Sequence, residues 1–146
     1  MGRMFLGAIA VVLFAGCSTF NRDWKSAAST TSTNVLAGRW QGTWLSDANG
    51  HTEQLRCLVT QTGATNYSAR FQAKYKRGFR FTFNYTVPLV VESGSSAVIF
   101  RGEADLGWAA GGVYCYEGNA DSTNFFSIYE CKYDRGTFRM TRPGAE

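Results

Sequence analysis

The sequence predicts an all-β fold: a single antiparallel up-and-down eight-stranded β-barrel that spans residues 35–146. From Leu36 onward, apolar and polar side chains alternate with a period of two, which is typical of strands with one buried face. Turn residues separate the alternating runs at short intervals. Because the hairpins follow one another without a long crossover, a meander that closes into a barrel is favoured over a sandwich.

The first two strands meet at Asn49-Gly50, the dipeptide that best fits a two-residue type I′ turn. A turn at this position sets the register of the hairpin and places the larger apolar residues on one face. The pairs it predicts are Trp44–Leu55, Gly42–Cys57 and Trp40–Val59.

The third and fourth strands, residues 67–75 and 79–87, carry aromatic residues at odd-numbered positions. A three-residue loop, Lys76-Arg77-Gly78, would join them with glycine in the left-handed position. Pro88 is expected to end the fourth strand or to place it at a sheet edge. The predicted pairs are Tyr75–Phe79, Ala73–Phe81 and Phe71–Phe83.

Four further strands are expected at residues 97–103, 113–118, 124–133 and 137–142. A glycine-rich connection, residues 106–112, precedes the sixth strand, and Arg135-Gly136 is the expected turn before the eighth. That turn predicts the pairs Tyr133–Phe138 and Cys131–Met140.

Gly38-Arg39-Trp40 opens the first strand, and this resembles the G-x-W motif of lipocalins and related calycins. In that family the tryptophan closes one end of the barrel beneath an arginine from the last strand. The resemblance therefore implies that Trp40 stacks against Arg139 or Arg142 through a cation–π contact.

The N-terminus has the parts of a secretory signal: Arg3, an apolar run over residues 4–14, and small residues before Cys17. The run is shorter than the ~20 residues that span a bilayer. Ala15-Gly16-Cys17 resembles the lipobox of bacterial lipoproteins, which implies a signal peptide over 1–16 and a lipid anchor on Cys17. The alternative is a plain signal peptide. Ser18, in place of aspartate, favours the periplasmic side of the outer membrane.

Residues 17–34 are expected to form the lipidated cysteine and a flexible tether, because most of the segment is small and polar. Trp24 is the exception. Next to Arg22 and Lys25, it suits either the membrane interface or a packing site on the barrel.

Three cysteines remain after Cys17. Cys115 and Cys131 fall on neighbouring predicted strands, where they either form a cross-strand disulfide or stay separate, and Cys57 is expected to be a small buried side chain. His51, the only histidine, is expected in a solvent-exposed loop. One histidine without partners predicts neither a metal site nor a catalytic triad, and no cofactor is expected.

Glu103, Asp105 and Trp108 lie on or beside the glycine-rich connection. They suit a rim for a ligand or partner, whereas the alternative is a loop whose tryptophan plugs the barrel mouth. A basic patch is also expected on the outer face of the third and fourth strands, where it would either meet lipid head groups or be simply solvated: Arg70, Lys74, Lys76, Arg77 and Arg80.

The formal charge of +4 includes Arg3, and this mild excess does not suggest nucleic-acid binding. The leading hypothesis is a non-catalytic interaction or structural module of the cell envelope with a largely filled barrel. The alternative is a carrier of a small apolar or aromatic ligand, with space at Ala69, Ala73, Gly102 and Ala104. An enzyme is not expected. The aromatic residues predicted to face inward are Trp40, Trp44, Tyr67, Phe71, Tyr75, Phe79, Phe81, Phe83, Tyr85, Phe100, Tyr129, Tyr133 and Phe138.

Overall fold

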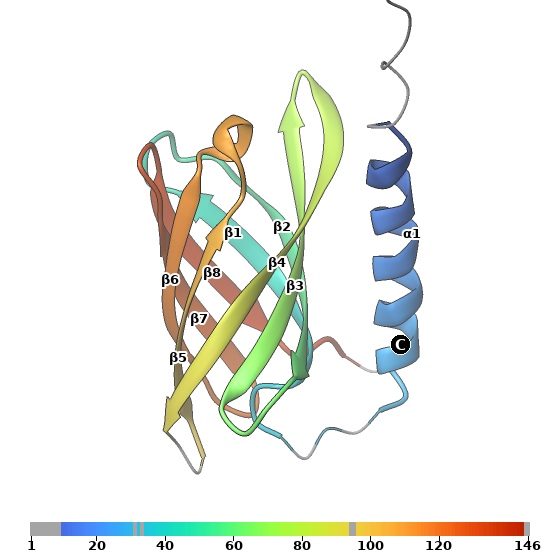
Figure 1. Ribbon diagram of the computed structural model, residues 1–146, viewed down its shortest axis with the longest axis vertical. Helices are drawn as coiled ribbons and strands as arrows, with labels where there is room; N and C mark the ends of the chain where they lie inside the picture. Colours follow the sequence, from blue (N-terminus) through green and yellow to red (C-terminus); the bar gives the residue numbers. More distant parts are fainter. Residues whose placement is uncertain (1–9, 31, 33, 94–95, 145–146) are drawn as a thin grey trace, which may run out of the picture.

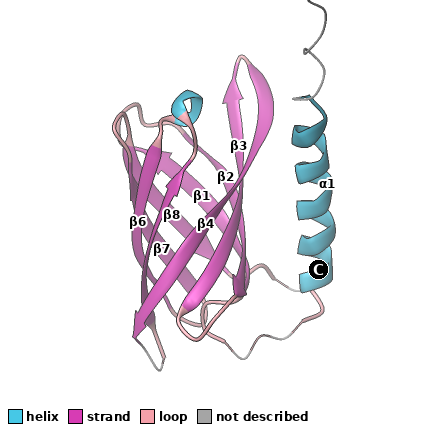
Figure 2. Ribbon diagram, in the orientation of Figure 1, coloured by secondary structure: helices cyan, strands magenta, loops and turns pink. Residues whose placement is uncertain are grey.

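A computed structural model describes residues 10–30, 32, 34–93 and 96–144. Its strands form a closed antiparallel barrel in sequence order, which confirms the predicted fold class (Figures 1 and 2). One helix lies outside the barrel, and one short 3-10 helix lies in a connection. The elements are α1 (Ala10–Ala27), β1 (Gly38–Ser46), β2 (Thr52–Gln61), β3 (Asn66–Arg77), β4 (Phe79–Ser93), β5 (Val98–Asp105), η1 (Trp108–Ala110), β6 (Val113–Ala120), β7 (Asn124–Glu130) and β8 (Arg135–Thr141).

The strand connections at one end of the barrel are residues 47–51, 78, 106–112 and 131–134, and we call this the open end. The opposite end, which we call the closed end, holds the connections 62–65 and 121–123 and the described residues 96–97 before β5. In Figure 1 the open end is at the top, where the β3–β4 hairpin and η1 project.

The register of the first two hairpins differs from the prediction by two residues. Trp40 pairs with Cys57 rather than Val59, and Phe71 pairs with Tyr85 rather than Phe83. The reason in the first hairpin is a longer turn, in which Ser46 N–H donates to the carbonyl of His51 (2.9 Å). Because side chains alternate with a period of two, an even shift leaves the predicted inward faces unchanged.

β4 continues through Pro88, so of the two alternatives expected there the edge position is confirmed and the strand end is wrong. Residues 79–90 pair with β3, but pairing with β5 begins only at Leu89. The first ten residues of β4 therefore form an edge, where a proline without an N–H is tolerated. As a result the β3–β4 hairpin extends past its β5 neighbour at the open end (Figure 1).

The closed half of the barrel is filled by side chains. Trp40 contacts Phe125, with 5.6 Å between ring centroids, and Phe125 contacts Phe100 at 4.8 Å. Leu36, from the segment before β1, is fully buried against them. Burial of these apolar side chains stabilises the barrel.

Helix α1 packs on the outer surface of the barrel, so the flexible tether expected from residue 18 was wrong as far as Ala27. Phe20 and Trp24, one helical turn apart, are buried against Leu58 of β2. The Arg56 guanidinium lies 5.3 Å from the Phe20 ring centroid and 5.0 Å from that of Trp24. Of the two roles weighed for Trp24, the structure shows packing on the domain.

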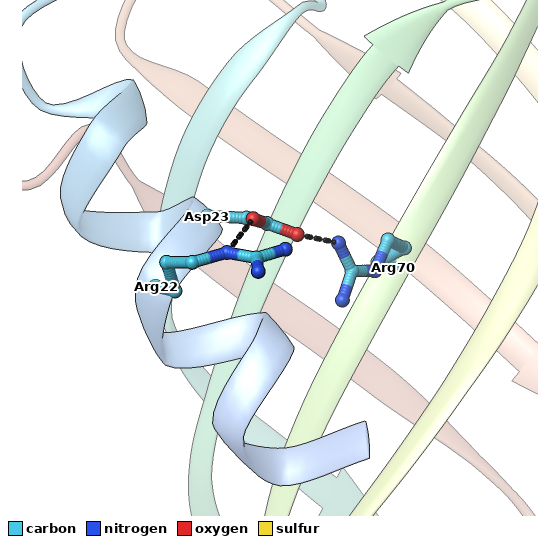
Figure 3. A network of polar contacts seen from close by, with 3 residues as sticks. All are labelled: Arg22, Asp23 and Arg70. Atoms are coloured by element: carbon cyan, nitrogen blue, oxygen red, sulfur yellow. Dashed lines mark hydrogen bonds and ion pairs between the residues drawn. The ribbon is translucent and has the colours of Figure 1, made fainter. Parts of the chain in front are cut away.

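A polar contact adds to this packing (Figure 3). Arg70 of β3 donates to Asp23 Oδ2 at 2.7 Å, and Arg22 donates to Asp23 Oδ1 at 3.1 Å. The two guanidinium groups hold the pKa of the Asp23 carboxyl below its ordinary value, through hydrogen bonds to Arg70 first and Arg22 second.

The predicted signal peptide begins in residues 1–9, which lie outside the described residues. Cys17 falls within α1, but its side chain is not among those described, so lipidation stays a prediction. Within the described part of the chain, no helix combines the length and apolarity needed to cross a bilayer.

Candidate functional site

A cavity of about 520 Å³ occupies the open half of the barrel. Its floor is formed by Tyr116, Tyr129 and Phe138, and its mouth is bordered by the β3–β4 hairpin on one side and Leu106–Ala110 on the other. The volume falls within the ~300–1,000 Å³ that small-molecule sites occupy.

Aromatic rings form most of the cavity wall. Trp44 and Tyr75 are stacked, with ring planes 9° apart and centroids 5.6 Å apart. At the floor, Tyr129 lies 5.1 Å from Phe138. These rings present flat faces and tilted edges to the interior, a surface that suits planar apolar ligands. The aromatic lining residues are Trp44, Tyr75, Phe79, Phe81, Phe83, Tyr85, Tyr114, Tyr116, Tyr129 and Phe138.

A small polar group lies at one side of this apolar wall. Asp134 accepts hydrogen bonds from the Tyr129 hydroxyl (2.9 Å) and from the Ser46 hydroxyl (2.7 Å). Tyr114 donates to the carbonyl of Ala110 (2.8 Å), which ties β6 to η1. A few fixed polar groups in an apolar pocket orient a ligand and give specificity.

The tyrosine hydroxyls around the cavity are held in the neutral form. Burial raises the pKa of Tyr114, Tyr116 and Tyr129 above the ordinary value, and for Tyr129 the hydrogen bond to Asp134 raises it further. Burial also raises the pKa of Tyr85 well above its usual range. These groups can therefore act as hydrogen-bonding partners for a ligand and not as bases at neutral pH.

The space exists because β4 and β5 pair over only part of their length and because Ala73 is small. Ala73 lines the cavity, as expected for a space-making residue. Ala69 is instead fully buried in the core. Gly102 allows a close approach of strands, since a Cβ there would lie 2.5 Å from the carbonyl oxygen of Pro88. Ala104 packs against the core, so only Ala73 has the predicted role.

Three aromatic residues predicted to face inward are exposed. Phe79 is 71% exposed and Phe81 is 43% exposed, because their part of β4 projects beyond the barrel. Tyr133 is 70% exposed, because β7 ends at Glu130 and residues 131–134 form the turn. The pairs predicted for this last hairpin were wrong: Phe138 lies opposite Ser127, and Met140 lies opposite Phe125.

At the closed end, Arg142 is the arginine that stacks on Trp40, with its Cζ 3.7 Å from the ring centroid. Arg142 also donates to the carbonyls of Ala37 (2.8 Å) and Val35 (2.7 Å). Arg139, the other candidate, lies over Phe126 instead.

Gly38 makes room for this arrangement. It has a φ of 108°, and a Cβ at this position would lie 2.9 Å from the Arg142 guanidinium. Glycine is the residue that adopts such a conformation without strain.

The predicted rim residues do not come together. Glu103 and Asp105 point outward from β5, and Asp105 accepts a hydrogen bond from the N–H of Gly107 (2.9 Å). Trp108 is 92% exposed on η1, so it does not plug the mouth. Trp108 stands at the cavity entrance, next to the lining residue Ala109, whereas neither carboxylate lines the cavity.

The Cys115–Cys131 disulfide is absent, and both thiols are free. Cys115 pairs with Glu130, one residue away from Cys131, and an odd offset puts the two side chains on opposite faces of the sheet. Cys57 is buried as predicted, and burial raises its thiol pKa well above the ordinary value. A thiol in this state is a poor nucleophile.

His51 was expected to be exposed to solvent, but it packs against the cavity wall. Its ring centroid is 5.2 Å from that of Trp44 and 4.9 Å from that of Tyr75. Sequence reasoning also missed Asp134 and Tyr114. Tyr114 could have been found from the sequence, because it is an aromatic residue two positions after the glycine-rich connection. Nothing in the sequence pattern indicated that Asp134 or His51 faces inward.

The predicted basic patch divides into two parts. Arg70 is engaged by helix α1, and Lys74 donates to Gln54 Oε1 (2.9 Å). Lys76, Arg77 and Arg80 instead cluster at the tip of the β3–β4 hairpin, around Gly78.

Among the described residues, no group of three or more His, Cys, Asp or Glu side chains is arranged to hold a metal ion. Comparisons with family models, with curated proteins and with solved structures each returned no match to this chain.

Proposed function

We propose that this protein is a non-catalytic binding module of the bacterial cell envelope, which holds a small apolar or aromatic ligand in the open half of its barrel. The observation that carries the proposal is the 520 Å³ cavity with its aromatic wall. Affinity would come from burying ligand surface against the rings, at ~25 cal/mol per Å².

The bound ligand would contain at least one polar atom as well as an apolar body. The Asp134–Tyr129–Ser46 group lies against a largely aromatic wall, where a ligand donor could share the carboxylate. Unmatched polar atoms facing this group would cost about 1–3 kcal/mol, so the group favours ligands that carry a hydrogen-bond donor.

A purely structural or interaction module, with no small ligand, is the second candidate. It is supported by the filled closed half of the barrel and by aromatic side chains that stand exposed at the open end. The two candidates differ in whether the cavity takes up a ligand.

The test is a titration of the detergent-solubilised full chain with a fluorescent aromatic probe, 1-aminoanthracene. We expect saturable binding that Ala73→Phe weakens roughly tenfold or more. Even a methylene-sized change in an apolar pocket is worth about 1–3 kcal/mol, and the added phenyl ring is larger. Thr86→Phe, which adds the same ring on the outer face of β4, is the matched control and should bind as the wild type does. Absence of saturable binding would favour the structural module.

We further propose that Cys17 carries a lipid anchor that holds the protein at the periplasmic side of the outer membrane. The support is the lipobox-like Ala15-Gly16-Cys17 and the serine that follows it. Growth with an alkyne-labelled fatty acid should label the wild-type chain but not Cys17→Ser, while Cys57→Ser should label normally. Equal labelling of wild type and Cys17→Ser would reject the anchor.

A further inference from the structure

Aromatic side chains stand exposed on three separate connections of the barrel, all at the open end. Phe79 and Phe81 belong to the β3–β4 hairpin, Trp108 to η1 and Tyr133 to the β7–β8 turn. No aromatic side chain is similarly exposed in the described part of the closed end. This one-sided distribution is not what a uniformly solvated barrel would show.

Basic side chains accompany these aromatic residues. Lys76, Arg77 and Arg80 flank Phe79 at the hairpin tip, and the Lys132 ammonium lies 5.4 Å from the Tyr133 ring centroid. Two of the carboxylates near this end already accept hydrogen bonds within the protein. Asp134 accepts from the hydroxyls of Ser46 and Tyr129, and Asp105 accepts from the N–H of Gly107. The hairpin tip therefore presents positive charge together with apolar rings.

Rings with adjacent basic groups match the interface of a bilayer. Tryptophan and tyrosine are enriched at the level of the head groups, and each lysine or arginine near an anionic surface adds to binding. An anionic polymer would attract the basic residues but would not account for the exposed Phe79, Phe81 and Trp108.

The orientation of α1 agrees with this partner. The helix runs along the barrel with its N-terminal residues toward the open end (Figure 1). After removal of the proposed signal peptide, Cys17 would be the first residue of this helix, so its lipid anchor would lie at the helix end that points toward the cavity mouth.

We propose that the open end docks on an anionic phospholipid bilayer, through the β3–β4 tip, Trp108 and Tyr133, so that the cavity mouth faces the lipid. This inference rests on the membrane attachment proposed above. It names the source of the ligand, since an apolar molecule would enter the cavity from the bilayer and not through water.

Trp108 offers a direct readout, because it is the one strongly exposed tryptophan among the four. The full chain is reconstituted in vesicles that contain phosphatidylglycerol and phosphatidylcholine with bromine-labelled acyl chains. We expect the bromines to quench tryptophan emission, and we expect Trp108→Phe to remove that quenched component. Quenching that persists in Trp108→Phe would come from another tryptophan and would contradict docking by this loop.

Two sets of variants test the chemistry of the contact. Neutralising Lys76, Arg77 and Arg80 to glutamine should shift the equilibrium away from the docked state by roughly 100-fold in anionic vesicles. It should have little effect in neutral vesicles. Arg101→Gln, which removes a basic residue from the outer face of β5, is the control and should not reduce the quenching.

Phe79→Ser with Phe81→Ser should also reduce the quenching, whereas Ile99→Ser, an exposed apolar residue nearer the closed end, should not.

Vesicle flotation separates the two proposals. A chain that floats with vesicles but shows no quenching of Trp108 would overturn docking alone. A chain that does not float would contradict both the attachment and the docking. If Trp108 is shielded from solvent in intact envelopes but is not quenched by lipid, the open end would contact a protein or polymer instead.

Discussion

The two halves of this barrel share eight strands but differ in what fills them. In the closed half, Trp40, Phe100 and Phe125 interlock, and Arg142 seals the end. In the open half, rings of similar size line a cavity of about 520 Å³. Both halves are aromatic, so composition does not decide which half is hollow. The difference lies in strand pairing, because β4 lacks a β5 neighbour along the part that borders the cavity.

The comparison assigns stability to the closed half and ligand binding to the open half. A packed interior without voids resists truncation of its side chains. A lined cavity has fewer contacts to lose, and its mouth residues are free to serve another partner. The predictions below test this division of roles.

The largest effect is expected from the closed end. Trp40→Ala should lower the free energy of unfolding by about 3–5 kcal/mol, because it removes a fully buried ring from a filled core. Trp108→Ala, at the open end, should change it by no more than about 0.5 kcal/mol. Denaturant unfolding measures both values.

Because Trp40→Ala can prevent folding altogether, Arg142→Gln provides a milder variant. It removes the cation–π contact and the hydrogen bonds to the carbonyls of Val35 and Ala37 in the segment before β1. It keeps the Trp40 Nε1–H bond to the carbonyl of Leu36 (2.8 Å). Equal losses of stability for Trp108→Ala and for the closed-end variants would break the comparison.

A second test uses alkaline pH to examine the open half. Four tyrosines of the cavity wall have pKa values raised by burial above the ordinary 10.0 of the phenol. A raised pKa means that the unfolded state ionises first as pH rises. The contribution of these tyrosines to stability should therefore be constant below about pH 10 and should be lost as pH rises above it.

The ultraviolet absorbance of tyrosinate, followed together with circular dichroism, measures this coupling. Ionisation of Tyr85, Tyr114, Tyr116 and Tyr129 should accompany loss of the barrel. Ionisation of all seven tyrosines in an intact barrel would show that the cavity wall is open to water.

The third prediction compares thiols across the structure. Alkylation of the native chain should modify Cys115 readily and Cys57 only after unfolding, because Cys57 is fully buried. The pKa of Cys115 is raised mainly by desolvation and, to a smaller extent, by the nearby Glu103 carboxylate. Glu103→Gln should therefore modestly speed the modification of Cys115. Glu53→Gln is the control. Recovery of a Cys115–Cys131 disulfide by mass spectrometry would contradict the register of β6 and β7.

The smallest effect is expected at α1. The lowered pKa of Asp23 stabilises helix docking at pH values above the ordinary 3.8 of the carboxyl, and this contribution is lost as pH falls through the lowered pKa. The contact is only partly buried, so salt should weaken it. Protection of the α1 amides from hydrogen exchange should fall below about pH 4 in the wild type. Asp23→Asn should lose this pH dependence, whereas Asp47→Asn should keep it.

The face of each strand was predictable from the sequence, but its register was not. Trp40, Trp44 and Phe71 face inward as expected, although their partners were two residues out. Turn length decides the register, and a longer turn such as residues 47–51 cannot be distinguished from a two-residue turn by Asn-Gly alone. For Cys115 and Cys131 the register differs from the one the disulfide requires by an odd number of residues. Of the two alternatives for these cysteines, the structure therefore shows separate thiols.

The cavity and the docked helix depend on relations between distant segments. Nothing local to β4 shows that its first ten residues lack a partner on one side, because that depends on where β5 ends. Similarly, Phe20 and Trp24 are isolated apolar residues in a polar segment. Their packing site on the outer face of β2 is bordered by arginines, a pattern that also suits solvent.

A crystal structure of the protein soaked with 4-bromophenol would test the central claim most directly, because anomalous scattering locates the bromine atom. The account predicts an anomalous peak in the cavity between Ala73 and Tyr116, with the phenol hydroxyl toward Asp134, and none beside Trp40. A peak within the Trp40 end, or an empty cavity at saturating ligand, would contradict it.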